Sequence, residues 1–425
     1  MHFPITRRGF IETSIASAGL ALWDSALTRV VAADESRKTP LPMAAVVTVY
    51  THWSHADVIV GKLLEGWQQD GGPGPDLKLV SLYVDQFPDN DLSVGLSKKY
   101  GFRMAKTIPE ALTLGTDSLG VGGVLLIGEH GTYPSVPETE QVMFPRRRFF
   151  DEAATTYRKC GQVVPTFCDK HLSYAWDDAK HMYDTARELR IPFMAGSSVP
   201  MMWRRPSATI PIDSEITEAF ALGDGGLEVH GIHALEGMQC LMERRRGGET
   251  GVKSVQAVKG DGIWQAEKAG HWSKALFDAV LEVAPTPYNG RVARPKEMDQ
   301  DTVFYLIEYR DGTKATIAMN TKLSHEFACA VSIRDQKKPF AVTFLAQEGP
   351  PYGHFEQLLK AIEQMMHTGT PAYPIERTLL TTGILDAALH SLVGKSVRLA
   401  TPHLAVEYEP VDWPFPKGTP PHPRV

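Results

Sequence analysis

Cysteine is scarce in this sequence, with 4 residues in 425. They stand at Cys160, Cys168, Cys240 and Cys329, and no two of them form the Cys-x-x-Cys spacing of zinc and redox motifs. Zinc-finger and thioredoxin-like classes are therefore excluded. Four buried thiols are one interpretation, and a disulfide between Cys160 and Cys168 is the other if the protein works in an oxidising compartment.

Excess positive charge is also absent. The formal net charge is -6 and the isoelectric point is about 6.2, so the chain lacks the basic footprint of a nucleic-acid-binding protein. The two short arginine runs, at 146–148 and 244–246, predict a solvated loop and a helix end rather than a binding patch.

The N-terminal apolar stretch, residues 15–23, is too short and too polar to span a membrane. Residues 6–11 (TRRGFI) form a twin-arginine signature before it, and residues 31–33 (VAA) are typical of a cleavage site after it. We therefore expect residues 1–40 to be a twin-arginine signal peptide and linker, cleaved near Ala33, and the protein to be periplasmic or otherwise exported. A disordered or helical cytosolic arm is the alternative.

Apolar runs and helical patterns alternate between residues 41 and 200. The predicted strands are 43–50, 77–84, 123–127, 162–167 and 193–196, and the predicted helices are 56–67, 93–100, 108–114, 149–159 and 176–189. This alternation is typical of βαβ units, so we predict an N-terminal Rossmann-like, doubly wound parallel sheet.

The pattern changes after residue 200. The predicted strands are 208–220, 253–258, 302–308, 314–320, 327–334 and 341–344, and the predicted helices are 230–245, 355–367 and 375–393. We expect a C-terminal α+β domain over 201–400 with an open, mostly antiparallel sheet, and helices 355–393 that can pack back on the first domain. Residues 401–425 are rich in proline and are expected to form an irregular strap or to be disordered.

Four stretches in this order carry a family resemblance: residues 54–56, residues 96–112, residues 168–196 and residues 225–236. Over about 43–400 the chain resembles the Gfo/Idh/MocA family of glucose–fructose oxidoreductases and inositol dehydrogenases. The resemblance implies an oxidoreductase that acts on a sugar or cyclic polyol with NAD or NADP. It also implies a homo-oligomer formed through the C-terminal sheet.

The loop after the first strand lacks the glycines of a dinucleotide fingerprint, which serve the tight turn and the close approach of the pyrophosphate. Thr51, His52, Trp53 and Ser54 stand there instead. The following helix still offers free N–H groups for an anion, so these four residues are candidate cofactor contacts.

Three further candidates for the cofactor follow strands. Asp85 ends the second strand, where an acidic residue binds ribose hydroxyls and favours NAD over NADP. Glu129 and His130 follow the third strand and are expected at the nicotinamide region or in the pocket of a replacement ligand. A surface role for Asp85 is the alternative.

The resemblance also assigns catalytic residues. Lys170 matches the family's lysine that orients the substrate hydroxyl, and His233 matches its acid/base histidine. The family's neighbouring aspartate is Val229 here, and His171 replaces its proline. The alternatives are a solvated lysine and a structural histidine.

Three residues are candidate substrate contacts: Trp203, Arg204 and His230. An aromatic ring and a guanidinium suit a sugar face and an acidic group, although a structural junction explains Trp203 and Arg204 equally well. Several histidines are expected near one sheet edge, but no carboxylate spacing supports a metal site, and we predict none.

Two functions remain open from the sequence. The first is an exported, nicotinamide-dependent oxidoreductase acting on a sugar or polyol. The second is a divergent carbohydrate-binding or sugar-processing protein that no longer binds NAD(P), and the glycine-free loop is the feature that separates them.

Overall fold

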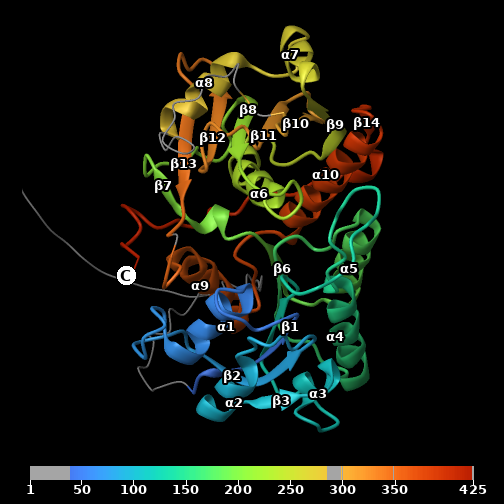
Figure 1. The fold of residues 1–425 in the computed structure, drawn as a ribbon, viewed down its shortest axis with the longest axis vertical. Coiled ribbons are helices and arrows are strands. Elements are labelled where there is room, and N and C mark those ends of the chain that lie inside the picture. The colour runs from blue at the N-terminus through green and yellow to red at the C-terminus, as the bar shows by residue number, and fades with distance from the viewer. Residues whose placement is uncertain (1–38, 285–297, 299, 348, 424–425) are drawn as a thin grey trace, which may run out of the picture. The chain divides into compact units, whose positions relative to one another are not determined.

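The N-terminal sheet has six parallel strands in the order β3-β2-β1-β4-β5-β6 (Figure 1). They are β1 (Leu41–Val47), β2 (Leu77–Val84), β3 (Arg103–Ala105), β4 (Gly123–Ile127), β5 (Thr166–Asp169) and β6 (Phe193–Gly196). This computed structural model describes residues 39–284, 298, 300–347 and 349–423. The twin-arginine motif and the cleavage site at Ala33 lie outside the described residues.

Helices cover both faces of this sheet, as the continuous apolar strands require. They are α1 (His55–Glu65), α2 (Ser93–Tyr100), α3 (Ile108–Thr113), α4 (Arg146–Cys160) and α5 (Trp176–Leu189). Ala44 and Val46 of β1 pack in the cluster formed with α3, α4 and α5, whereas Met43, Ala45 and Val47 pack in the cluster formed with α1. The predicted Rossmann-like arrangement is confirmed.

A helix from the C-terminal part of the chain, α9 (Gly353–Thr368), completes the second of these faces. Leu358, Ile362 and Met365 of α9 are fully buried in the same cluster as β1 and α1, and α9 lies beside α1 in Figure 1. The start of α9 is thereby brought to the loop that follows β1.

The second sheet has eight strands in the order β14-β9-β10-β11-β8-β12-β13-β7. They are β7 (Trp203–Arg205), β8 (Ile216–Gly223), β9 (Val252–Lys259), β10 (Val303–Tyr309), β11 (Lys314–Met319), β12 (Phe327–Ile333), β13 (Phe340–Leu345) and β14 (Leu399–Ala400). All pairs are antiparallel except β8 with β11. The predicted open, mostly antiparallel sheet is confirmed.

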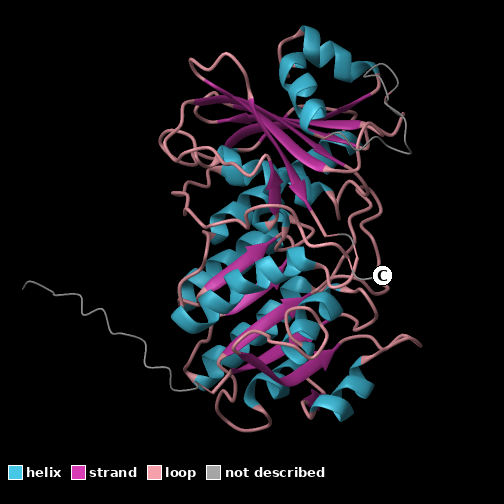
Figure 2. Ribbon diagram, turned by 90° about the vertical axis from the view of Figure 1, so that its left-hand side faces the viewer, coloured by secondary structure: helices cyan, strands magenta, loops and turns pink. Residues whose placement is uncertain are grey.

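This sheet is also covered on both faces (Figure 2). On one face lie α6 (Gly231–Met242) and α10 (Ile375–Val393), and on the other lie α7 (Asp261–Lys268) and α8 (Lys274–Val283). Phe220 and Phe304 of the sheet pack against Trp272 and Phe277. In the described residues, the chain thus packs its own helices against both faces of this sheet.

Several local expectations were wrong. The strand expected over 208–220 begins only at Ile216, and residues 203–205 form the edge strand β7 instead of a connection. The arginine run at 146–148 was expected in a solvated loop, but it begins α4 and Arg146 is buried against Glu129. The run at 244–246 does follow the end of α6, with Arg245 buried against Glu249. All four cysteines are free, so Cys160 and Cys168 form no disulfide.

The C-terminal segment after β14 forms a strap along the second domain. A short 3-10 helix, η4 (Pro402–Leu404), buries Leu404, and Tyr408 makes a β-bridge with Glu249. A second short 3-10 helix, η1 (Val199–Met201), follows β6. No helix in the described part of the chain is long and apolar enough to cross a membrane.

Candidate functional site

A pocket of about 540 Å³ borders the carboxyl edge of the first sheet. Five histidines line it: His55, His130, His230, His233 and His354. Four aromatic side chains complete its walls: Trp53, Phe327, Tyr352 and Phe355. We call this site the histidine pocket. Among the described residues that line it there is no Asp, Glu, Lys or Arg.

The histidines come from segments far apart in the sequence. His55 opens α1, His130 follows β4, His230 and His233 begin α6, and His354 lies in the first turn of α9. The rings of His55 and His130 are 5.3 Å apart, and that of His55 meets Phe355 edge-on at 4.9 Å. The parallel sheet gathers the first two at one edge, and α6 and α9 bring in the others.

Three residues at this edge adopt left-handed backbone conformations. Trp53 has φ of 62°, His130 has φ of 68° and Lys170 has φ of 62°. For residues other than glycine such a conformation costs on the order of 1 kcal/mol, and it recurs at active sites and ligand clamps. The three follow β1, β4 and β5, so they lie at the edge where parallel α/β sheets bind ligands, although other left-handed residues occur elsewhere in the described chain.

A hydrogen bond to a buried carboxylate orients His55. Its Nδ1 lies 2.5 Å from Oδ2 of Asp169, the last residue of β5, whose side chain is 2% exposed. A carboxylate can only accept a hydrogen bond, so Nδ1 of His55 is the donor. In the neutral ring the other nitrogen, Nε2, then carries the lone pair.

The other imidazoles of the histidine pocket are neutral at pH 7. Burial lowers the pKa of His354 to about 3 and holds that of His233 well below its usual range. His130 keeps part of its ring exposed at the rim, yet desolvation of the remainder lowers its pKa to about 4. Nδ1 of His354 is buried without a hydrogen-bond partner in the structure. A polar but uncharged ligand suits such walls.

Behind the pocket lies a buried network of charges. Lys170 Nζ donates to Glu129 Oε1 at 2.8 Å and to the Val229 carbonyl at 3.0 Å. Arg146 Nη2 donates to the other oxygen, Glu129 Oε2, at 2.5 Å. Burial alone raises the pKa of Glu129, but Lys170 and Arg146 outweigh it and hold that pKa well below its usual range. Lys170 is thus a fixed, buried cation and not a solvated loop residue.

The network continues through His171, which replaces the family's proline. His171 Nε2 lies 3.2 Å from both Arg146 Nη1 and Glu228 Oε1. Burial and the charge of Arg146 lower the pKa of His171. Arg146 and Glu228 are components that sequence reasoning missed, because one stood in an arginine run and the other lies near α6, with no motif to mark either.

Side chains in and next to the loop after β1 accept hydrogen bonds from backbone N–H groups at the start of α1. Ser54 caps the helix by accepting the Asp57 N–H, and its hydroxyl donates to the Thr51 carbonyl at 2.7 Å. The Trp53 N–H donates to Asp57 Oδ2 at 2.9 Å, and His52 Nδ1 lies 3.7 Å from the same oxygen. A carboxylate therefore already sits where an anion would bind.

These residues do not fit a dinucleotide in the usual pose of this fold. A pyrophosphate at the start of α1 would lie against the Asp57 carboxylate, and like charges repel. The ring of Trp53, 62% exposed, stands in the same loop where the fingerprint has glycines.

Asp85, the candidate ribose ligand, is also engaged. Its oxygens accept hydrogen bonds from Tyr83 at 2.8 Å, Tyr133 at 2.7 Å and Arg148 at 2.5 Å. Burial raises the pKa of Asp85, but these donors outweigh it and the net shift is downward. These three bonds leave Asp85 about one of its four acceptor sites for the hydroxyls of a ribose.

Two candidate substrate residues lie elsewhere. Trp203 and Arg204 are buried in β7, at the edge of the second sheet, and neither lines the histidine pocket. Arg204 stacks over Phe415 of the strap at 4.2 Å and donates to Thr209 at 2.9 Å. The surroundings of Trp203 and Arg204 are therefore those of a structural junction, the alternative to substrate binding. His230, in contrast, lines the histidine pocket.

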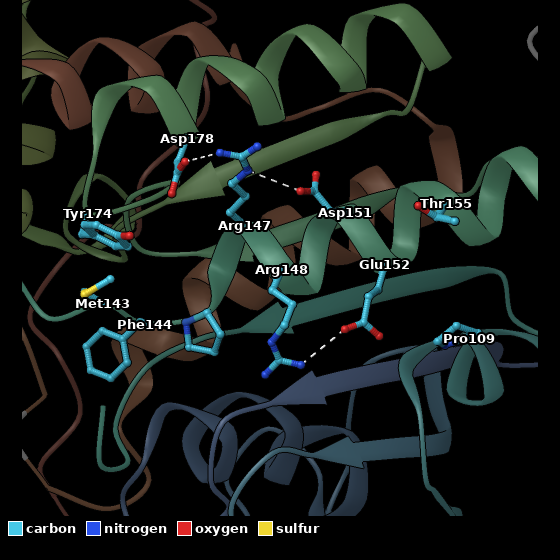
Figure 3. Close-up of a pocket in the computed structure, with 11 residues that line it drawn as sticks. Pro109, Met143, Phe144, Arg147, Arg148, Asp151, Glu152, Thr155, Tyr174 and Asp178 are labelled. Carbon is cyan, nitrogen blue, oxygen red and sulfur yellow. Dashed lines mark hydrogen bonds and ion pairs between the residues drawn. The ribbon is translucent and has the colours of Figure 1, made fainter. Parts of the chain in front are cut away.

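A second hollow, of about 500 Å³, runs along the outer side of α4 (Figure 3). Figure 3 shows Arg147 directed toward Asp178 and Asp151, and Arg148 toward Glu152. Because its arginines are already paired and its lining lacks the strained backbone of the sheet edge, we place the functional site in the histidine pocket. The described residues contain no cluster of side chains suited to a metal ion.

Comparison with known proteins shows the fold and no more. No family model and no curated protein matches the sequence. The structure is similar to that of GenD2 from gentamicin A biosynthesis in complex with NAD, with a TM-score of 0.54, 12% identity, and coverage of 87% of this chain and 99% of that one. A probable dehydrogenase from Thermotoga maritima gives a TM-score of 0.52 at 12% identity, covering 85% of this chain and 99% of that one.

A third solved structure, apo scyllo-inositol dehydrogenase from Lactobacillus casei, gives a TM-score of 0.51 at 12% identity, covering 85% of this chain and 98% of that one. The chain thus has the α/β fold of Gfo/Idh/MocA-type NAD-binding dehydrogenases, with a Rossmann-like parallel sheet and a second, mostly antiparallel sheet. Identities this low show the shared fold only, so function has to be argued from the site.

Proposed function

We propose that this protein binds a sugar or cyclic polyol in the histidine pocket and processes it by proton transfer, without a dinucleotide in the usual site of this fold. The observation that carries the proposal is the lining: five imidazoles and four aromatic rings around about 540 Å³, with no Asp, Glu, Lys or Arg among the described lining residues. Imidazoles offer donors and acceptors to hydroxyls, and aromatic faces suit the apolar faces of a sugar ring. The volume is within the usual range for small-molecule sites.

The same lining disfavours other sugar chemistry. Hydrolysis of a glycosidic bond ordinarily uses two carboxyl groups that flank the bond. The nearby carboxylates, Asp169 and Glu129, are buried and already paired with His55, Lys170 and Arg146. Histidine is therefore the residue type available for proton transfer here.

An NAD-dependent oxidoreductase is the second candidate. It is favoured by Lys170, buried beside the pocket, and by His233 within it, the two residues that the family resemblance assigns to catalysis. The fold shared with GenD2, solved in complex with NAD, supports it as well. The Asp57 carboxylate and the engaged Asp85 argue against it.

A ligand screen separates the two. The purified protein is denatured and analysed by mass spectrometry for released nucleotide, and its thermal unfolding is followed with NAD, NADP, D-glucose and myo-inositol. We expect no nucleotide, no shift with NAD or NADP, and a rise in Tm with a sugar or polyol, because a ligand that binds the native state stabilises it. Bound nucleotide, or a shift of several degrees with NAD, would establish the second candidate instead. The scyllo-inositol dehydrogenase with the same fold serves as the positive control.

We also propose that the protein is exported by the twin-arginine route, on the strength of Arg7 and Arg8. Replacing both by lysine should keep the protein in the cytoplasm with an intact N-terminus. The exported wild type should begin just after Ala33, as N-terminal sequencing would show. A homo-oligomer remains a prediction, and it would need a surface other than the sheet face under α7 and α8.

A further inference from the structure

The hydrogen-bond partners behind the histidine pocket assign different roles to its imidazoles. A neutral imidazole has one N–H donor and one lone-pair acceptor, and the partner of one nitrogen decides the role of the other. The proton position of each ring can therefore be worked out from the atom that faces its Nδ1.

His230 and His233 are donors toward the pocket. The Gly226 N–H donates to Nδ1 of His230 at 3.0 Å, so the proton of His230 is on Nε2. Nδ1 of His233 lies 2.5 Å from Ser197 Oγ, which itself accepts the Val199 N–H at 3.0 Å. The hydroxyl proton of Ser197 can then be donated to Nδ1, and in that tautomer the N–H of His233 is on Nε2 as well.

His55 is the opposite case. Asp169 accepts the hydrogen bond from Nδ1–H of His55, so Nε2 is the lone-pair nitrogen of the neutral ring, which lines the pocket. A buried carboxylate behind an imidazole also stabilises the imidazolium that forms when Nε2 accepts a proton. His55 therefore differs from both donors in having a negative charge behind it.

We propose that His55 is the catalytic base of the histidine pocket, oriented by Asp169, and that His230 and His233 hold an oxygen of the bound substrate as hydrogen-bond donors. This inference rests on the proposed function and names its substrate class: a sugar or cyclic polyol in its carbonyl form. The fold resemblance points to His233 as acid/base, so the assignment of the base to His55 comes from the contacts of this chain.

The step needs no oxidant. His55 Nε2 takes the proton from the carbon next to the carbonyl, so one C–H bond breaks and one N–H bond forms. The electron pair of that bond becomes a C=C bond, and the carbonyl π electrons move to the oxygen. That oxygen accepts hydrogen bonds from Nε2–H of His233 and His230, which stabilise the developing charge. Return of the proton to the same carbon, on one face or the other, restores the carbonyl and gives the starting sugar or its epimer at that carbon.

Hydrogen–deuterium exchange in D2O tests the assignment. D-fructose and 2-keto-myo-inositol serve as probes, and NMR follows deuterium entering the carbon next to the carbonyl. We expect exchange with the wild type. A general base contributes roughly 100-fold or more, so His55→Gln should slow exchange by at least that factor. Asp169→Asn should also slow it, because the amide no longer fixes the tautomer of His55.

His233→Gln is the matched control. Glutamine keeps an N–H donor but is not a base, so the same substitution removes the role proposed for His55 and spares the role proposed for His233. We expect His233→Gln to slow exchange by less than about tenfold. Thermal shifts with the probes, measured on every variant, report folding and binding separately from exchange. If His55→Gln fails to fold, His55→Ala with added imidazole is used, and recovery of exchange is expected.

The outcomes separate this inference from the proposed function. Absence of sugar binding by the wild type would overturn both. Binding without exchange, or exchange that survives in His55→Gln and is lost in His233→Gln, would overturn the assignment of His55 and leave the sugar site standing.

Discussion

Glu129 is the single carboxylate that two buried cations share at the edge of the first sheet. Lys170 and Arg146 are 5% and 0% exposed, and each donates to a different oxygen of Glu129. The strained backbone of Lys170 places its side chain in this network and not in solvent. The position of the family-like lysine therefore depends on Glu129.

We predict that Glu129→Gln destabilises the protein by about 3–5 kcal/mol, the range for removing one partner of a buried ion pair. The loss arises because both cations remain buried without a compensating charge. Urea unfolding of the two proteins measures it. Glu188→Gln is the control, since the Glu188–Arg158 pair is exposed and should change stability by no more than about 1 kcal/mol. Equal effects of the two substitutions would show that the network contributes nothing.

The strands and helices differ in how well the sequence predicts them. The continuous apolar runs of β2, β4 and β6 and the amphipathic pattern of α5 predicted the observed bounds, because burial in a parallel sheet requires such runs. Helices α7 and α8 were missed. They are stabilised by covering Phe220 and Phe304 on the second sheet, a tertiary contact that the sequence does not show.

The site was predictable only in part, for the same physical reason. His130 and Lys170 directly follow strands, so their place at the sheet edge could be expected from the sequence. His354 could not, because it reaches the pocket through the packing of α9 against α1. The pairing of His55 with Asp169 depends on the start of α1 lying beside the end of β5 in space and has no sequence signal.

The contact between α6 and α10 contains an acid with an unusual pKa. Glu236 of α6 is 0% exposed, and its Oε1 accepts the Thr381 hydroxyl at 2.6 Å while Oε2 has no hydrogen-bond partner. Burial, only partly offset by Arg377, raises the pKa of Glu236 to about 7.

We predict that this group makes stability fall as pH rises. Between the ordinary pKa of 4.5 and about 7 the folded protein holds a proton that the unfolded chain has lost. The stabilisation is complete below pH 4.5 and disappears through pH 7, a change of about 3 kcal/mol. Glu236→Gln should remove this part of the slope, so the variant should be more stable than the wild type at pH 8 and similar at pH 5. If the free energies of unfolding of the two proteins, measured with urea, change equally with pH, the assignment to Glu236 is contradicted.

The strap after β14 connects the end of the chain to both layers of the second domain. Asp412 pairs with Arg244 at 2.6 Å, and Phe415 lies under Arg204. Gln347, before α9, donates to the Pro421 carbonyl at 2.7 Å. The proline-rich segment expected to be a strap or disordered therefore makes specific contacts throughout its described length, and the candidate substrate residue Arg204 belongs to this contact.

Tyr408 is the buried centre of the strap and the best place to test its contribution. Its hydroxyl donates to Glu243 Oε2 at 2.9 Å and accepts from Gln239 at 3.0 Å, beside the buried Glu243–Arg377 pair. Tyr408→Phe keeps the ring but leaves both groups without this partner, so we expect a loss of about 1–3 kcal/mol in the free energy of unfolding. Tyr183→Phe, which removes a single half-exposed bond to Glu376, should lose about 1 kcal/mol or less. If the two substitutions lower the free energy of unfolding equally, or if Tyr408→Phe leaves the unfolding midpoint unchanged, the rest of the fold is stable without the strap. A larger decrease for Tyr408→Phe would show that the strap stabilises α6 and, through it, the positions of His230 and His233.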